Sequence, residues 1–349
     1  MAKHPSIDSY VDDKIAKDEF EKSLDDGLVY IGHKLMVPNK GDYFVLPSYK
    51  GRYALVNTGE SYLMLSNVCS HRQALLLEGK GNVKSINCRL HCWGFELNGK
   101  LKLTPLFKEP VKNADLESFE LKEWNGLLFK TRLPDFDLES LGLSEYINFE
   151  GYEFAGSSIE QYSFNWKVFM EIYLENYHVF SMHPGLKKYV TAADLEWKTG
   201  EDYSVQKVGL GKSIQTGNTE SYTLWQQEII KHFEPNLPRY GAIWSLIYPN
   251  IMIEHYPNII AISTVHPLGA RQCLNQVEFY YPSQLYKEKP QYFEAMQKAY
   301  AETAVEDNDA CMLLQKGREA LHSRGDEKYG PIEDFLEKGV EEFYKFLAK

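Results

Sequence analysis

Two short motifs, each with one cysteine and one histidine, constrain this chain more than any other feature of its sequence. Cys69 and His71 lie in the first motif, Cys88 and His91 lie in the second, and sixteen residues separate His71 from Cys88. Thiolates and imidazoles are ligands of transition metals. The spacing predicts that two loops on a compact scaffold hold one metal centre between them.

Two kinds of metal centre accept two thiolates and two imidazoles. One is a tetrahedral zinc ion, and the other is a [2Fe-2S] cluster with cysteines on one iron and histidines on the other. Structural zinc sites usually take both cysteines from one loop and both histidines from the other. Here each loop supplies one of each, which favours a Rieske-type cluster. Zinc, and four unrelated core residues, are the less favoured alternatives.

Short β segments surround both loops. Runs at 43–46, 53–57, 62–65, 85–87 and 126–130 are separated by glycines and turns, which predicts a small all-β domain over residues 40–135. After Pro134 the pattern changes, and this marks the boundary with a second domain at residues 136–349. We expect residues 1–39 to form an N-terminal helical segment that packs on the second domain.

The second domain is predicted to mix strands and helices. Three apolar strands at 242–248, 259–266 and 274–280 are separated by Pro-Asn and Pro-Leu-Gly turns, which predicts an antiparallel meander. Amphipathic helices are expected at about 166–177, at 290–323 and at 332–347. The predicted fold class is therefore α+β.

The predicted helix at 166–177 carries a second group of candidate metal ligands. Glu171, Glu175 and His178 fall at i, i+4 and i+7, on one helical face, and His183 follows five residues after His178. Two histidines and one carboxylate form the facial triad of mononuclear iron(II) sites, which leaves positions open for dioxygen. The pattern predicts such a site, with one further ligand still to be found.

Asp307 is the candidate for the third ligand. It lies on the apolar stripe of the C-terminal helix, whose members follow one another at steps of three or four residues: Phe293, Met296, Tyr300, Ala304, Asp307, Cys311 and Leu314. A carboxylate on a buried stripe is costly unless it is paired or binds a metal. The neighbouring Glu306 and Asp309 point off the stripe, and we expect them to be solvated.

Charge and composition exclude some classes of partner. The chain has 38 Lys and Arg against 49 Asp and Glu, a net charge of −11, and no long basic run, which argues against nucleic acid. Its longest apolar runs are far shorter than the ~18 residues of a membrane span, and its first residues lack an export signal. Five cysteines, an odd number, suit a reducing compartment. We expect a cytoplasmic protein without membrane or nucleic-acid partners.

With these motifs in view, the chain resembles the Rieske non-haem iron oxygenases. Cys-Ser-His-Arg at residue 69 and Cys-Arg-Leu-His-Cys-Trp-Gly-Phe at residue 88 are similar to the Rieske domain of that family. Asn-Trp-Lys at residue 165, the two following histidines and the segment from Glu306 to Gly317 resemble the iron-binding parts of its alpha, or terminal oxygenase, subunit. The resemblance extends over nearly the whole chain.

This resemblance implies a fold and cofactors. The fold would be a small all-β Rieske domain joined to a helix-grip catalytic domain, in which an antiparallel sheet wraps around a long helix. Each subunit would hold one [2Fe-2S] cluster, on Cys69, His71, Cys88 and His91, and one Fe(II), on His178, His183 and Asp307. The sequence departs from the family pattern at Cys92, a thiol directly after the second cluster histidine, which removes no ligand.

The resemblance also implies how electrons reach the iron. The chain has no Gly-x-Gly-x-x-Gly fingerprint, so an NAD(P)H-dependent reductase or a ferredoxin would supply them. In the family the cluster and the iron of one chain are too far apart, and a head-to-tail homotrimer brings them together between subunits. A carboxylate then bridges a cluster histidine to an iron histidine. Here Glu175 would bridge His91 and His178; the family usually has aspartate, and its carnitine monooxygenase branch has glutamate.

Substrate class follows from a finer resemblance. The segment at 247–256 and the closing Gly-Pro-Ile-Glu at residue 330 look most similar to the choline, glycine-betaine and carnitine monooxygenase branch. This implies a monooxygenase or dioxygenase that uses O2 to hydroxylate a small quaternary amine, or to dealkylate or cleave it at nitrogen. Aromatic faces would hold the cation. The candidate pocket residues are Phe180, Trp197, Trp225, Trp244 and Tyr248.

Two other functions stay open at this point. One is an oxygenase that hydroxylates or demethylates an aromatic or heterocyclic acid, which would need an Arg or Lys to hold the carboxylate. The other is a Rieske electron carrier with no catalytic activity. The second group of ligands argues against a carrier, since passing electrons needs no mononuclear iron site.

Overall fold

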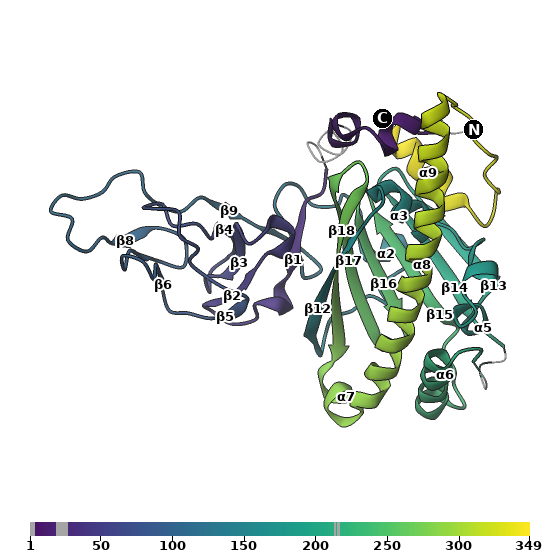
Figure 1. Cartoon of the computed structure of the whole chain (residues 1–349). Coiled ribbons are helices and arrows are strands. Elements are labelled where there is room, and N and C mark those ends of the chain that lie inside the picture. The colour runs from purple at the N-terminus through teal and green to yellow at the C-terminus, as the bar shows by residue number, and fades with distance from the viewer. Residues whose placement is uncertain (1–3, 19–26, 213, 215–216) are drawn as a thin grey trace. The chain divides into compact units, whose positions relative to one another are not determined.

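The computed structural model describes residues 4–18, 27–212, 214 and 217–349. The chain divides into two compact units (Figure 1). The smaller unit comprises residues 26–135, and the larger comprises residues 1–25 and 136–349. The α+β fold class is confirmed. No helix among the described residues is both long and apolar enough to cross a membrane.

The smaller unit consists of three antiparallel sheets. Its largest sheet has five strands in the order β5-β2-β3-β4-β9, and two three-stranded sheets have the orders β1-β11-β10 and β6-β7-β8. The bounds are β1 Tyr30–His33, β2 Asp42–Val45, β3 Tyr53–Asn57, β4 Tyr62–Ser66, β5 Lys80–Asn82, β6 Ile86–Asn87, β7 Gly94–Phe95, β8 Leu101–Leu103, β9 Ser118–Glu120, β10 Lys122–Trp124 and β11 Leu127–Phe129. Two 3-10 helices, η2 Lys34–Met36 and η3 Pro47–Tyr49, complete it.

The first domain boundary lies earlier than the sequence predicts. Strand β1 pairs with β11, so that Tyr30 lies opposite Phe129 and His33 opposite Leu127. This pairing makes β1 part of the smaller unit, although we expected its residues in the N-terminal helical segment. Only the part of the chain before residue 26 belongs with the larger unit, where Tyr10 is buried.

The larger unit is built on a seven-stranded antiparallel sheet in the order β12-β18-β17-β16-β15-β14-β13. The bounds are β12 Tyr152–Tyr162, β13 Val190–Thr199, β14 Tyr203–Leu210, β15 Tyr240–Ile247, β16 Ile251–Tyr256, β17 Ile259–Gly269 and β18 Gln272–Pro282. The meander has a fourth strand, β16, which the sequence analysis missed. It lies between Pro249 and Pro257, in the stretch that separates the first two predicted strands.

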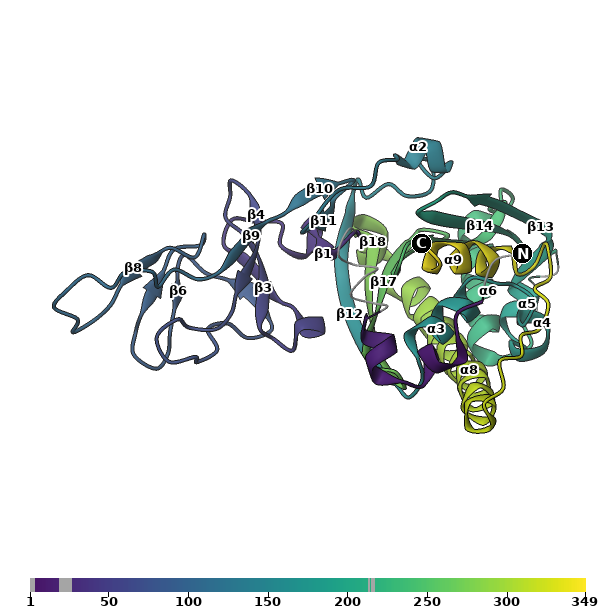
Figure 2. The same cartoon turned by 90° about the horizontal axis from the view of Figure 1, so that it is seen from above.

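Most helices of this unit lie on one face of the sheet, and the short helix over residues 138–141 lies apart from them (Figures 1 and 2). The bounds are η1 Ile7–Tyr10, α2 Leu138–Leu141, α3 Trp166–Tyr173, α4 Val179–Met182, α5 Leu186–Tyr189, α6 Glu220–Phe233, α7 Ser283–Glu288, α8 Pro290–Arg324 and α9 Lys338–Leu347. The 35-residue helix α8 starts at a proline and ends at Gly325, which adopts φ 69°. Proline at a helix start and a left-handed glycine just past its end are favoured at those positions.

Two predicted helices are shorter than the sequence suggests. Asn165 caps α3 by accepting a hydrogen bond from the Lys167 backbone, but the helix stops at Tyr173, so Glu175 and His178 lie beyond it. The last helix begins at Lys338 and not at residue 332. In both places turn residues interrupt an amphipathic pattern that by itself favours helix.

A buried ionic cluster attaches the N-terminal segment to the larger unit. Glu171 on α3 accepts hydrogen bonds from the Tyr10 hydroxyl and the Arg318 guanidinium. The Arg318 guanidinium also lies 4.1 Å from the centre of the Tyr10 ring. The cluster therefore joins η1, α3 and α8, and Glu171 is used for packing rather than for metal binding.

Candidate active site

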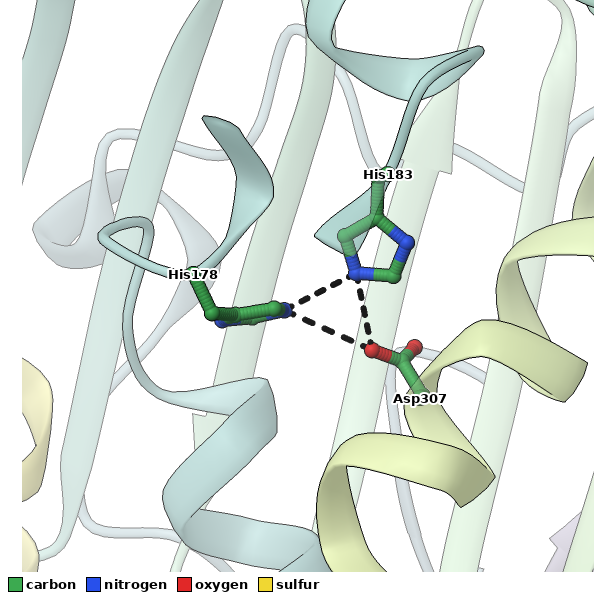
Figure 3. A group of neighbouring side chains, drawn as sticks. All are labelled: His178, His183 and Asp307. Atoms are coloured by element: carbon green, nitrogen blue, oxygen red, sulfur yellow. Dashed lines mark hydrogen bonds and ion pairs between the residues drawn. The ribbon is translucent and has the colours of Figure 1, made fainter. Parts of the chain in front are cut away.

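Three predicted iron ligands meet on the larger unit (Figure 3). His178 directly precedes the short helix α4, His183 directly follows it, and Asp307 projects from α8. The Nε2 atoms of the histidines are 2.9 Å apart, and the Asp307 Oδ1 atom lies 3.0 Å from His183 and 3.4 Å from His178. A single turn of helix between the two histidines turns both rings toward α8.

The Nδ1 atom of each imidazole contacts a supporting carboxylate. The His178 Nδ1 atom is hydrogen-bonded to Glu175, which also accepts the backbone N–H groups of Tyr177 and His178. The His183 Nδ1 atom lies 2.7 Å from the Glu306 Oε2 atom. Our expectation that Glu306 is solvated is therefore wrong: its side chain is only 20% exposed and supports a histidine.

These contacts also set the protonation of the isolated ligands. Burial lowers the pKa of His178, but hydrogen bonds to Asp307 and Glu175 outweigh it and raise the pKa to about 9. Burial raises the pKa of Asp307, and the two imidazoles outweigh it, so that this pKa is lowered. The Asp307 carboxylate is thus ionised and available as a ligand.

The arrangement fits a ferrous ion. Donor atoms about 2.1 Å from a common ion and at right angles to one another would be about 3.0 Å apart, close to the three separations found here. Carboxylate partners on both Nδ1 atoms fix the tautomer that leaves each Nε2 free to coordinate. His178, His183 and Asp307 could therefore hold one iron with the other positions open.

A pocket with many aromatic side chains in its wall adjoins the three ligands. Of the predicted substrate residues, Trp225 and Trp244 line it. Trp225 is buried and packs edge-on against Tyr292, with 4.9 Å between ring centres. The pocket also receives Phe169, Tyr173, Tyr256 and Tyr300.

The other three predicted pocket residues lie elsewhere. Phe180 is 79% exposed on α4. The Trp197 indole donates a hydrogen bond to the Phe335 carbonyl, 2.8 Å away, and Tyr248 packs against Phe346. Aromatic identity alone does not distinguish a pocket wall from core or surface, and these three residues do not line the pocket beside the three ligands.

The sequence analysis missed a carboxylate in this pocket. Glu254 lines it from β16 and is only 4% exposed. Burial raises the pKa of Glu254 to about 7. A glutamate inside the apolar strand Ile251–Tyr256 was a signal that could have revealed it. The neighbouring His255 is not among the residues that line the pocket.

The four predicted cluster ligands lie on two loops of the smaller unit that share one hydrogen-bond pattern. In the first loop the Cys69 N–H donates to Ala74, and the Gln73 N–H donates to Cys69. The second loop repeats both bonds: the Cys88 N–H donates to Trp93, and the Cys92 N–H donates to Cys88. Cys69 and Cys88 therefore occupy equivalent positions, whereas His71 comes two residues after its cysteine and His91 comes three residues after its own.

Like ligands face one another across the two loops. The buried thiols of Cys69 and Cys88 interact, and the rings of His71 and His91 have centres 4.7 Å apart. Burial raises the pKa of Cys88, but the backbone N–H groups of Leu90 and His91 outweigh it and lower the pKa, which favours a thiolate. This donor set fits a [2Fe-2S] cluster with two thiolates on one iron and two imidazoles on the other.

Cys92 has a conformational role in the second loop. It is exposed and adopts φ 59°, and Gln73 at the equivalent position of the first loop adopts φ 56°. Its backbone, rather than its thiol, makes the bond that closes the loop.

Comparison with known proteins agrees with both sites. Residues 27–122 match the Rieske [2Fe-2S] domain, and residues 141–349 match the ring hydroxylating alpha subunit (catalytic domain). The chain is 39% identical to putrescine 2-hydroxylase of Ralstonia nicotianae over 98% of its own length and 94% of that protein. It is 26% identical to the chloroplastic choline monooxygenase of Amaranthus tricolor over 97% of its own length and 75% of that protein.

Solved structures show the same fold. The quaternary ammonium Rieske monooxygenase CntA in complex with an inhibitor superimposes with a TM-score of 0.77 at 19% identity, covering 98% of this chain and 94% of CntA. Like its relatives, the chain is an O2-dependent oxidoreductase with a Rieske [2Fe-2S] cluster and a non-haem iron, and it works with a reductase or ferredoxin on a small substrate. The chain belongs to the Rieske oxygenase family, in which a Rieske domain is joined to a ring-hydroxylating alpha catalytic domain.

Proposed function

We propose that the chain is a terminal oxygenase that hydroxylates a small aliphatic amine. The observation that carries the proposal is the charge of the pocket: the described residues that line it include the carboxylates of Glu175, Glu254 and Asp307 and no Lys or Arg. Glu175 and Asp307 face the iron site, which leaves Glu254 to attract a cation, and the described wall offers an anion no Lys or Arg. The similarity to a putrescine hydroxylase and to choline monooxygenases supports the same substrate class.

The same observation weighs against an aromatic or heterocyclic acid as substrate. Recognition of a carboxylate needs an Arg or Lys, or a set of N–H donors in its place. Lys and Arg are both missing from the described part of the pocket wall. A pure electron carrier would not need the group of His178, His183 and Asp307, and it would not need the catalytic domain that this family has.

The site residues have separate roles in this proposal. His178, His183 and Asp307 hold the iron, which when bound supplies the chemistry that activates dioxygen. Glu175 and Glu306 orient the two histidines, and the aromatic wall excludes water from the substrate. Cys69, Cys88, His71 and His91 hold the cluster.

We further propose that the chain works in the cytoplasm as a homotrimer. Glu175 would then link His178 to His91 of the partner subunit and carry the electron between them. Support comes from the position of Glu175 on His178 and from the exposure of the His91 ring on its loop. Analytical ultracentrifugation tests the trimer, and a Glu175→Gln variant that keeps both metal centres but loses cluster-to-iron electron transfer in rapid-quench experiments tests the bridge.

Oxygen uptake tests the proposed function. Purified protein is first assayed for iron and acid-labile sulfide, with about three irons and two sulfides expected per chain. The protein with a Rieske-oxygenase reductase and NADH is then given putrescine, choline or benzoate. Uptake coupled to a hydroxylated amine supports the proposal, and product formation with benzoate alone would overturn it.

A further inference from the structure

Glu254 is a buried acid without a cationic partner. It is 4% exposed, and its hydrogen bonds among the described residues come from two tyrosine hydroxyls. The described lining of its pocket contains no Lys or Arg. A buried carboxylate is costly unless it is neutralised or paired, so this position is suited to a cation that arrives from solution.

The two tyrosines fix the orientation of the carboxylate. The Tyr256 hydroxyl donates to the Oε2 atom over 2.7 Å, and the Tyr300 hydroxyl donates to the Oε1 atom over 3.2 Å. Tyr256 is itself held by the Trp244 indole, which donates to its oxygen over 3.0 Å. Each carboxylate oxygen has a second lone pair, so Glu254 can still accept two hydrogen bonds from a ligand.

Glu254 and the iron ligands lie along the same pocket. Trp244 on β15 is directly opposite Glu254 in the sheet, and both residues line the pocket. Tyr300 precedes Asp307 by seven residues on α8, which corresponds to about 10 Å along the helix. A short alkylamine can therefore contact Glu254 at one end while its carbon chain extends toward the three ligands.

We propose that Glu254 binds a primary ammonium group of the substrate, and that Tyr256 and Tyr300 position it for this contact. This inference rests on the proposed function and narrows it to primary alkylamines. A primary ammonium has N–H groups for the two remaining lone pairs, whereas a quaternary ammonium has none. A site built to accept hydrogen bonds discriminates strongly against an analogue that lacks the donors.

The chain offers a closely matched control residue. Glu278 on β18 is a second buried glutamate whose oxygen accepts a hydrogen bond from the tyrosine two residues later, over 2.6 Å from Tyr280. Glu278 does not line the pocket. Glu278→Gln therefore makes the same chemical change in the same sheet, away from the proposed substrate.

The test compares Glu254→Gln with Glu278→Gln and the wild type. Loss of a charged hydrogen bond predicts a rise of about 10-fold to 100-fold in KM for putrescine with Glu254→Gln, and little change with Glu278→Gln. kcat should change less than KM, and iron and sulfide contents should stay at wild-type values. Tyr300→Phe, which keeps the carboxylate, should raise KM by a smaller factor.

Binding and turnover together separate the possible failures. Putrescine binding to the intact protein is measured by calorimetry, beside oxygen uptake with putrescine and choline. Unchanged putrescine affinity in Glu254→Gln would overturn the role of Glu254 and leave the amine oxygenase intact. Turnover of choline but not putrescine by the wild type would also overturn it. A wild type that oxidises neither amine would overturn the proposed function itself, and this inference with it.

Discussion

Removal of the Glu306 carboxylate, which contacts His183, should weaken iron binding although all three iron ligands remain. The His183 Nδ1 atom and the Glu306 Oε2 atom are 2.7 Å apart, and the Glu306 side chain is 20% exposed. Loss of a carboxylate that orients a metal-bound histidine typically lowers metal affinity 10-fold to 100-fold, or about 1.4 to 2.8 kcal/mol. Glu306→Ala should show this loss. Glu306→Gln should show less, since its amide oxygen can still accept the Nδ1 proton.

The assay is competition for Fe(II) between the protein and a chromogenic chelator under anaerobic conditions. Asp309→Asn is the matched control, because Asp309 lies three residues along the same helix and is exposed. The [2Fe-2S] cluster provides an internal standard in every sample. Glu306→Ala should also regain turnover at saturating Fe(II). If Glu306→Ala holds iron as tightly as Asp309→Asn, the reasoning about this contact is refuted.

Three further predictions concern pH, stability and the independence of the two metal centres. Burial raises the pKa of Glu254 to about 7, and the ionised form of Glu254 is the one that binds an ammonium. The value of kcat/KM for putrescine should therefore rise through that pH in the wild type, and Glu254→Gln should not show this rise. Glu171→Gln should leave Arg318 buried without its counter-charge and destabilise the larger unit by about 3 kcal/mol, seen as a fall in Tm of roughly 6 to 12 °C. An unchanged Tm would contradict a structural role for this pair. Cys88→Ser should remove the cluster and its visible absorbance while iron analysis still finds about one iron per chain; loss of all iron would show that the two centres depend on each other.

The sequence indicated the ligands better than the elements that carry them. Cys69, His71, Cys88 and His91 were singled out by their spacing, because a metal centre needs specific atoms at short chain separations, and the structure brings the two loops that carry them together. His178, His183 and Asp307 were also singled out, although the helix assumed to carry the first histidine stops at Tyr173. Periodicity placed the side chains on one side of the chain, but it could not show where turn residues interrupt the helix.

The pocket was harder to predict for a physical reason. Its wall combines strands that are far apart in sequence with one face of α8, so membership depends on strand order and register. Trp244 and Glu254 face each other only because β15 pairs with β16, a strand that is not among the three predicted for the meander. Phe180 and Tyr248 are equally aromatic, yet one lies at the surface and the other in the core.

The repeated backbone pattern of the two cluster loops has a consequence for which ligands each iron of the cluster would receive. The loops share their closing hydrogen bonds, and their first residues, Cys69 and Cys88, meet each other. His71 and His91 also meet, although they come two and three residues after their cysteines. A cysteine that precedes a histidine in both loops would give one iron two sulfur ligands and the other two nitrogen ligands. Exchanging cysteine and histidine within a single loop would keep the composition of the site and the number of charges, but it would give each iron one ligand of each kind. The asymmetry between the two irons would therefore follow from the shared order of cysteine and histidine in the two loops.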